Sequence, residues 1–360
     1  MAFLIASIAS IVVVLVSPFM GQLQAFLRRS LTTENYVLLF GASLMVAVGG
    51  ATLYAFLRVR ERRLLRFGAL AVALAAGGGY LWSVSTPWPE VNAVERVHFV
   101  EYGLIVFLYY RAWRPAGDLS ILILPVLLAF MVGTLDEWLQ WFIPVRVGEL
   151  HDVLLNLVSI VCGLVFAVAL QPPSSFTWLL KPESRMRFGV ISAGVWLVCA
   201  GFVSAVHLGH ENEVDGIGRF LSRHTVTELD ALQAHRAESW KASPPTTLRR
   251  LSQEDQYLDE GIWHVRRRNQ TDGEEAWREN LILERLFAPV LDIPTYASPN
   301  GNRWAAEQRA NLEARLEANA APWVSRANPY PIILWPKRYF WPVAITMALL
   351  LAALPFAIRR

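Results

Sequence analysis

The sequence predicts an all-α integral membrane protein: a helical bundle of about eight spans, with a mainly helical polar domain inserted before the last span. Hydrophobic residues make up 54% of the 360 residues and charged residues only 18%, whereas soluble domains carry about 25% charge. Long apolar runs recur along the chain, which also holds 14 Trp, a residue enriched at membrane interfaces. With only Cys162 and Cys199 present, disulfide-rich scaffolds and multi-thiolate metal sites are excluded.

Each predicted span is a run of about 20 mostly apolar residues, the length that crosses a bilayer as a helix. The runs lie near residues 2–20, 36–57, 67–85, 97–112, 120–142, 152–170, 188–207 and 338–357. The third contains Gly77, Gly78 and Gly79, which favours close helix contact. The first could instead be a cleaved signal peptide, but its uncharged start and the lack of a small-residue cleavage site favour an uncleaved anchor.

Positive charge in the short loops predicts the orientation. Clusters of Arg and Lys lie at 58–66, 111–114, 181–187 and 359–360. If every span crosses, these clusters share one side, which the positive-inside rule assigns to the cytoplasm. We therefore expect a multi-pass protein of the inner (plasma) membrane with both termini cytoplasmic and residues 208–333 extracytoplasmic. Arg28 and Arg29, in a predicted outer loop, oppose this orientation.

Residues 208–333 are predicted to form a separate domain between the bundle of residues 1–207 and a last helix at 334–360. This insertion holds 15 basic and 19 acidic residues, whereas the rest of the chain holds 18 and 11. Apolar periodicity predicts helices near 218–240 and 274–291, the latter capped by Asp272, and composition predicts another near 303–319. No convincing strand alternation is found. Because the basic residues lie in loops between spans, they indicate membrane topology rather than nucleic-acid binding.

Polar side chains in three neighbouring spans gather at one predicted end of the bundle. Ionisable groups inside spans are costly, so they are functional candidates by default. Helical spacing puts each set on one face, as with Asp136 and Gln140 four residues apart. The sequence therefore predicts an outward-facing polar pocket. Its expected lining residues are Arg96, His98, Glu101, Tyr102, Asp136, Glu137, Gln140, Arg146, Asp152 and Asn156.

The spacing of these residues resembles the VanZ-like family of membrane proteins. The motifs read Arg96-x-His98-Phe99 with Tyr102, then Asp136-Glu137-x-x-Gln140-x-x-x-Pro144-x-Arg146, then Asp152-Val153-x-x-Asn156. The match covers about residues 95–163, within an apolar frame over about 35–170. Ser159 stands where the family usually has Gly. The resemblance implies a cell-envelope protein, and the family's named member is associated with low-level resistance to the glycopeptide teicoplanin.

We predict from these residues and the resemblance that the pocket binds an amphiphile. A membrane lipid head group, a lipid-linked wall precursor or a glycopeptide-like drug fits this description. We find no nucleophile elbow and no Gly-rich phosphate loop, and we expect no cofactor. Binding without catalysis is therefore favoured, with His98 as the candidate acid or base if a reaction occurs, because its ordinary pKa lies near neutrality.

Other roles for the same residues stay open. Asp136 and Asp152 could act as paired acid and base carboxylates, or Arg96 and Arg146 could neutralise them as part of packing. The arginines could equally hold a phosphate group.

Metal binding, subunit and transporter functions are the remaining alternatives. A metal site from His98, Glu101, Asp136, Glu137 and His151 lacks the usual motif spacing, so we expect none. The chain could instead be a non-catalytic accessory subunit of a larger membrane complex that docks partner subunits through 208–333. A transporter is disfavoured, because two matching halves with broken helices are not found.

Overall fold

The computed structural model describes residues 1–142, 150–242, 253–293, 301–314, 322–328 and 330–357. The chain divides into two compact units. The first comprises Met1–Gln140, Gly148–Phe202 and Pro342–Arg360. The second comprises Val203–Trp341 together with the stretch that begins at Trp141.

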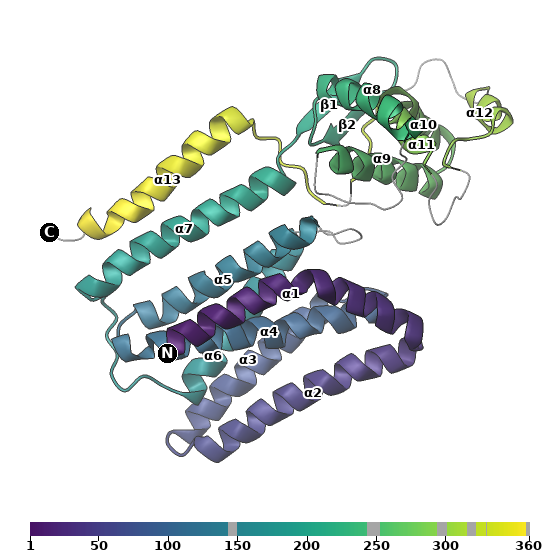
Figure 1. Ribbon diagram of the computed structural model, residues 1–360. Coiled ribbons are helices and arrows are strands. Elements are labelled where there is room, and N and C mark those ends of the chain that lie inside the picture. Colours follow the sequence, from purple (N-terminus) through teal and green to yellow (C-terminus); the bar gives the residue numbers. More distant parts are fainter. Residues whose placement is uncertain (143–149, 243–252, 294–300, 315–321, 329, 358–360) are drawn as a thin grey trace. The chain divides into compact units, whose positions relative to one another are not determined.

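Long helices build the first unit (Figure 1). They are α1 (Ala2–Ser30), α2 (Thr33–Arg58), α3 (Arg63–Ser83), α4 (Pro89–Trp113), α5 (Ser120–Trp141), α6 (Leu150–Leu170), α7 (Pro182–Val206) and α13 (Lys337–Ala357). A short 3-10 turn, Arg114–Ala116, follows α4. Each helix overlaps one of the predicted apolar runs, although α1 extends to Ser30 and α4 already begins at Pro89.

Fewer helices than the predicted eight are long and apolar enough to count as membrane spans by length and composition alone. Six described helices qualify: α2, α3, α5, α6, α7 and α13. A seventh qualifies if the two arms of α1, bent by 54°, count as one span. The charged residues of α4 exclude it from this set, so α4 remains only a predicted span. It packs against α1, α2, α3 and α6, and this packing partly buries its polar side chains.

The core of the first unit lies along α4. Tyr102, Ile105 and Val106 are buried against Val132 of α5 and Ile160 of α6. The α4 and α6 backbones touch at two glycines, because a Cβ built on Gly163 would lie 2.6 Å from the Gly103 Cα. Small residues allow such close approach between helices in a membrane.

The predicted glycine contact on α3 is present at one of its three positions. A Cβ built on Gly77 would lie 2.7 Å from the Phe99 ring of α4, whereas Gly78 and Gly79 have no described atom within 4 Å. The α3–α4 contact thus depends on Gly77 alone among the three.

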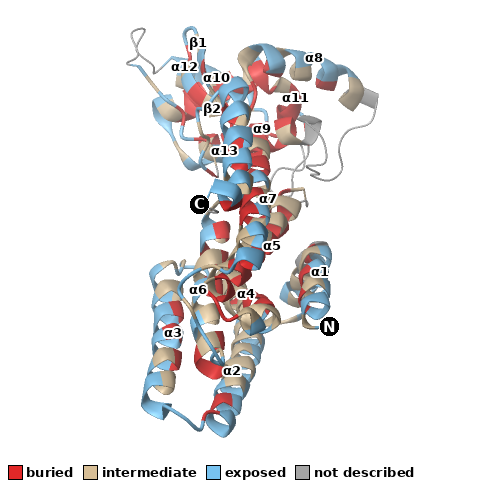
Figure 2. Cartoon of the chain, turned by 90° about the vertical axis from the view of Figure 1, so that its left-hand side faces the viewer, coloured by how far each residue is buried: buried red, intermediate tan, exposed pale blue. Residues whose placement is uncertain are grey.

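Large apolar side chains remain exposed on the outer helices of this unit. On α2, Val46 and Phe56 are exposed, as is Leu349 on α13. Figure 2 shows α2 and α3 largely in the colour of exposed residues, whereas α4 and α5 carry many buried ones. Exposed apolar helix faces of this length suit contact with lipid tails.

Side chains satisfy free backbone groups at the start of α2 and at the end of α6. Thr32 caps α2 by accepting a hydrogen bond from the Asn35 backbone N–H at 3.3 Å. The Arg66 guanidinium donates to the carbonyl oxygens of Ala169 and Leu170, each at 2.6 Å. A cation at this position satisfies the free carbonyls of α6 and its helix dipole.

The second unit contains, among its described residues, an antiparallel hairpin and five helices. The hairpin is β1 (His210–Val214) and β2 (Gly218–Ser222), paired from His210 with Ser222 to Val214 with Gly218. The helices are α8 (Val226–Ala242), α9 (Gln253–Gln270), α10 (Gly273–Leu286), α11 (Ala288–Leu291) and α12 (Ala306–Glu313).

The predicted helix at 218–240 is partly wrong, because its first residues form β2. Gly216 and Gly218 have φ angles of +73° and +136°, which favour glycine and make the hairpin turn. Asp272 stands at the predicted start of α10, although its side chain makes no capping hydrogen bond to the described residues. The expected helix near 303–319 corresponds to α12, with part of it outside the described residues.

The core of the second unit joins the hairpin to its helices. Phe220 packs with Tyr257 of α9, with Leu283 of α10 and with Phe287. A charged pair is also buried here: Arg223 Nε donates to Glu260 Oε1 at 3.0 Å, and both side chains are almost fully buried.

The two ends of the second unit run side by side. Leu208 and Ile333 form a parallel β-bridge. The Ile333 N–H donates to the His207 carbonyl at 2.7 Å, and the Gly209 N–H donates to the Ile333 carbonyl at 3.2 Å. The chain therefore enters and leaves this unit at one place.

Candidate functional site

Helix α4 contributes one polar stripe to the predicted site. The ring of His98 stacks on that of Tyr102, with centroids 5.8 Å apart and planes inclined by 14°. His98 Nδ1 lies 3.7 Å from Glu101 Oε2. Tyr102 is fully buried, while His98 and Glu101 are half-buried. Spacings of three and four residues put all three on one side of α4.

Helix α5 adds two buried carboxyl groups bridged by an amide. Gln140 Nε2 donates to Asp136 Oδ2 at 2.9 Å and to Glu137 Oε1 at 3.1 Å. The Tyr102 hydroxyl donates to the same Asp136 oxygen at 2.9 Å. Asp136, Glu137 and Gln140 are each at most 3% exposed. Two adjacent acids this deeply buried need such partners, because a lone buried charge is very costly.

Helix α6 places a buried amide next to this network. Asn156 is 0% exposed, and neither its Oδ1 nor its Nδ2 has a hydrogen-bond partner among the described residues. Its side chain lies against the backbone of α5, since a Cβ built on Gly133 would be 3.2 Å from Asn156 Cβ and 3.3 Å from both Asn156 Nδ2 and a Tyr102 ring carbon. Asn156 and Tyr102 thus flank Gly133. Buried amides are nearly always hydrogen-bonded, so this one requires an explanation.

We use the name polar cluster for His98, Glu101, Tyr102, Asp136, Glu137, Gln140 and Asn156, which the structure brings together. Asp152 lies one turn before Asn156 on α6 and interacts electrostatically with Glu95 of α4. Arg96 is half-buried on α4, where Glu95 is its neighbour. Arg146, the other expected arginine, lies outside the described residues.

Carboxyl and amide groups dominate the chemistry of the polar cluster. Glu101, Asp136 and Glu137 offer acceptor oxygens, while Asn156 offers both a donor and an acceptor. Such a set can bind hydroxyl, amide or ammonium groups. Within the part of the chain that the structure describes, no group of three His, Cys, Asp or Glu side chains could hold a metal ion.

Two of the glycines that shape the cluster, Gly133 and Gly103, were not predicted from the sequence. Gly133 leaves room for Asn156 against α5, and the contact of Gly103 with Gly163 brings α4 close to α6. The available signal was spacing: Gly133 precedes Asp136 by three residues, so both lie on the same side of α5.

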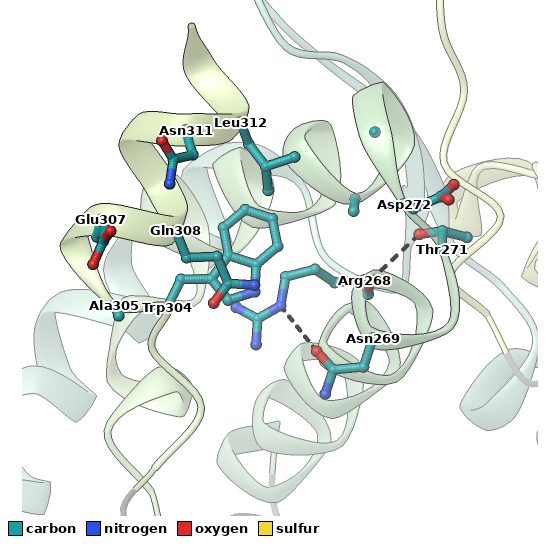
Figure 3. A pocket seen from close by; sticks show the side chains of 12 residues that line it. Arg268, Asn269, Thr271, Asp272, Trp304, Ala305, Glu307, Gln308, Asn311 and Leu312 are labelled. Carbon is teal, nitrogen blue, oxygen red and sulfur yellow. Dashed lines mark hydrogen bonds between the residues drawn. The ribbon is translucent and has the colours of Figure 1, made fainter. Parts of the chain in front are cut away.

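A hollow of about 690 Å³ lies in the second unit and includes none of the predicted site residues that the structure describes (Figure 3). The Arg268 guanidinium stacks over the Trp304 ring at 5.0 Å. It donates to Asn280 Oδ1 at 2.9 Å and to the Asn302 carbonyl at 2.6 Å. Because these partners already engage the guanidinium, the hollow gives no sign of an anionic ligand.

The part of the chain that holds the polar cluster is similar to a known protein family. Residues 4–171 match the family model described as VanZ/LLP1. This part of the chain, slightly less than half of it, is similar to the VanZ/LLP1 family, and we call it the VanZ-like region. The VanZ-like region runs from α1 to the end of α6, so it begins earlier than the apolar frame expected from the sequence and contains every residue of the polar cluster.

The rest of the chain lies beyond the family match. Helix α7, the second unit and α13 follow residue 171. No curated protein and no solved structure matches the chain. The VanZ-like region and the apolar helices together fit a multi-pass membrane protein of the cell envelope.

Proposed function

We propose that the VanZ-like region binds the polar head of an amphiphile at the polar cluster. A membrane lipid, a lipid-linked wall precursor or a glycopeptide-like drug would carry such a head. The single observation that carries this proposal is the Asn156 amide, which is fully buried without a hydrogen-bond partner among the described residues. Leaving such a group unsatisfied costs about 1–3 kcal/mol, and a bound hydroxyl or amide group would remove that cost.

The neighbours of Asn156 support the same role. The Tyr102 ring and the Asn156 side chain both lie next to Gly133. The Tyr102 hydroxyl also donates a hydrogen bond to Asp136. A head group that reaches Asn156 therefore meets an aromatic ring and an acidic acceptor. Arg96 and Arg146 remain the proposed partners of a phosphate in the same ligand, because arginine binds phosphate through two parallel hydrogen bonds.

The experiment is native mass spectrometry of the full chain after gentle extraction. We expect the wild-type protein to retain an amphiphile and Asn156→Leu to lose it. Leu is of similar size and lacks the unsatisfied amide, so the thermal stability of this variant should be equal or higher. Ser159→Ala is the matched control, because the Ser159 hydroxyl donates within α6, to the Leu155 carbonyl at 2.8 Å.

Two outcomes would reject the proposal. One is a wild-type protein without any retained amphiphile. The other is an Asn156→Leu variant that retains the same amphiphile in the same amount as wild type.

A second function is favoured by the hydrogen bonds of α4 and α5. The Tyr102 hydroxyl of α4 donates to Asp136 of α5, and Gln140 links Asp136 to Glu137 within α5. The bond between α4 and α5 is expected if these residues serve to hold helices together. The chain would then be a non-catalytic subunit that binds other membrane proteins through residues 208–333. A stoichiometric protein partner in the same mass spectra, without a small ligand, would favour this function.

A further inference from the structure

A second hollow lies in the first unit, where three helices begin or end, and none of its lining residues belongs to the polar cluster. It measures about 430 Å³, within the range of small-ligand sites. Arg28 at the end of α1, Thr33 and Tyr36 at the start of α2, and Trp88 and Glu90 at the start of α4 line it. We call it the α1–α2 hollow.

The α1–α2 hollow holds a cation and an anion. The Thr33 hydroxyl donates to Glu90 Oε1 at 2.7 Å and so fixes the carboxylate. The Arg28 guanidinium lies over the Tyr36 ring, 5.6 Å from its centroid, and interacts electrostatically with Glu90. A ligand that matches this pair carries a negative and a positive group close together.

Tyr36 supplies an independent sign of a ligand. Its side chain is only 1% exposed although it lines the hollow, and its hydroxyl has no hydrogen-bond partner in the described part of the chain. A buried tyrosine hydroxyl normally finds a partner. A ligand oxygen in the hollow would satisfy it.

Exposed tryptophans at the end of α3 and at the start of α4 indicate the depth of the hollow in the membrane. Trp88 is 67% exposed, and Trp82, at the end of α3, is 84% exposed. Tryptophan is enriched at the level of lipid head groups, where its ring is apolar and its N–H is wet. We therefore expect the α1–α2 hollow to lie at the level of phospholipid head groups.

We propose that the α1–α2 hollow binds the zwitterionic head group of a phospholipid of the phosphoethanolamine type. Arg28 and the Tyr36 hydroxyl contact the phosphate, because both donate hydrogen bonds to anionic oxygen. Glu90 and the ring of Trp88 hold the ammonium group through an ion pair and a cation–π contact. This site is additional to the polar cluster and does not depend on the function proposed for it.

The charges predict a choice between head groups. Phosphatidylethanolamine satisfies both Arg28 and Glu90. Phosphatidylglycerol has the phosphate but lacks the ammonium group, so its negative charge faces Glu90 uncompensated. We therefore expect the hollow to prefer the zwitterionic lipid.

Native mass spectrometry of the full chain in detergent, with equimolar phosphatidylethanolamine and phosphatidylglycerol, tests this proposal. We expect wild type to retain mainly phosphatidylethanolamine. Glu90→Gln should bring the two lipids to nearly equal retention, since Gln still accepts from Thr33 but lacks the charge. Arg28→Gln should reduce retention of both lipids by about tenfold, which corresponds to one charge-assisted hydrogen bond. The matched control is Arg29→Gln, next in sequence but absent from the hollow, which should behave as wild type.

Tyr36→Phe separates a ligand role from a folding role. It keeps the ring under Arg28 and removes only the hydroxyl. Without lipid, its thermal stability should equal or exceed that of wild type, because an unsatisfied buried group is gone. With phosphatidylethanolamine, its lipid-induced rise in unfolding temperature should be smaller than that of wild type.

Specific results would overturn the proposal. Equal retention of the two lipids by wild type would do so, as would unchanged lipid retention in Arg28→Gln or an unchanged lipid ratio in Glu90→Gln. If soluble glycerophosphoethanolamine bound as tightly as the lipid, the ligand would be a free phosphoamine and the lipid assignment would be wrong. Asn156→Leu should leave the lipid ratio unchanged, so failure at the polar cluster remains distinguishable from failure here.

Discussion

Arg223 and Glu260 form a buried ion pair in the second unit. Burial by itself would raise the pKa of Glu260, but Arg223 and the Ser222 hydroxyl lower it overall. The carboxylate also accepts from the Arg223 backbone N–H at 3.2 Å. Because the pKa is lower in the folded state, this group contributes stability above its ordinary pKa of about 4.3, and that stability is lost as pH falls through the lowered value.

Removing one partner should therefore be far more harmful than removing a surface charge. We expect Glu260→Gln to lower the free energy of unfolding by about 3–5 kcal/mol, because Arg223 would remain buried without its anion. Denaturant unfolding of the full chain in detergent measures this. The control Asp292→Asn breaks the exposed pair with Arg303 and should cost less than about 1 kcal/mol. Equal effects of the two substitutions would contradict the prediction.

His224 should make stability depend on pH near neutrality. Burial lowers its pKa, and Arg223 adds to this while Glu260 opposes it. The unfolded chain has an ordinary His pKa near 6.5, so it binds more protons than the folded chain below that pH. The stabilisation is complete above about pH 6.5 and is lost as pH falls through the lowered pKa of the folded state.

The unfolding midpoint at about pH 7.5 and at about pH 5.5, on either side of the ordinary His pKa, measures the contribution of His224. We expect His224→Gln to show a smaller drop between these two pH values than wild type. His235→Gln, on the more exposed side of α8, should keep the full drop. An unchanged drop in His224→Gln would show that other groups cause it.

His98 offers a test of binding against proton transfer at the polar cluster. If His98 only donates a hydrogen bond, His98→Gln should keep the retained amphiphile, whereas His98→Ala should lose it. If both variants lose the amphiphile alike, a hydrogen bond alone does not explain the role of His98, and an acid or base role is indicated.

The residues of the polar cluster were predictable from the sequence, whereas their partners were not. Spacing along a helix predicts which of its side chains share a face, and this sufficed for His98, Tyr102, Asp136 and Asn156. Hydrogen bonds between helices depend on rotation and distance, which the sequence does not encode locally. The bond from Tyr102 to Asp136 and the unsatisfied amide of Asn156 therefore emerged only from the structure.

Among the helices, the close contact of α4 with α6 is highly sensitive to substitution. We expect Gly163→Val to destabilise the bundle by about 1–3 kcal/mol or more, because its side chain would meet the Gly103 backbone and Val106 and overpacking is costly. Gly78→Ala on α3, with open space around it, should be neutral or stabilising by up to about 1 kcal/mol. Thermal unfolding in detergent compares the two, and similar losses would contradict the packing argument.

Long helices were easier to predict than the short hairpin. Apolar runs of about 20 residues specify α2, α3, α5, α6, α7 and α13 without regard to tertiary contacts. The strands β1 and β2 are only five residues each, too short for alternation to stand out from helical spacing. The Asp215-Gly216 pair was the available signal, since this dipeptide favours hairpin turns.

At the scale of the whole molecule, the orientation in the membrane remains a prediction that labelling can test. In a chain with Cys162→Ala and Cys199→Ala, a cysteine introduced by Ala306→Cys should react with a membrane-impermeant maleimide on intact cells. One introduced by Glu61→Cys, between α2 and α3, should react only after the membrane is opened. The reverse pattern would place residues 208–333 in the cytoplasm.

The family match and the structure divide the molecule differently, and each boundary has a physical basis. The VanZ-like region ends at residue 171, whereas the first unit also includes α7 and α13. These two helices pack on one another, since Trp196 Nε1 donates to the Ala344 carbonyl at 2.9 Å and Gly189 lies against Pro355. The sequence predicted both helices, but not that residues so far apart in the chain form a pair.

The bridge between Leu208 and Ile333 has a consequence for how such a chain can arise and be engineered. An inserted domain whose first and last residues are neighbours can be gained, lost or exchanged as one piece. The helices on either side of it need not move apart to accommodate it. A gene encoding α7 joined to α13 by a short flexible linker should therefore still yield a membrane-integrated product. For the same reason, an unrelated domain with adjacent termini could be inserted between Leu208 and Ile333. This junction is therefore a suitable insertion site for a reporter domain.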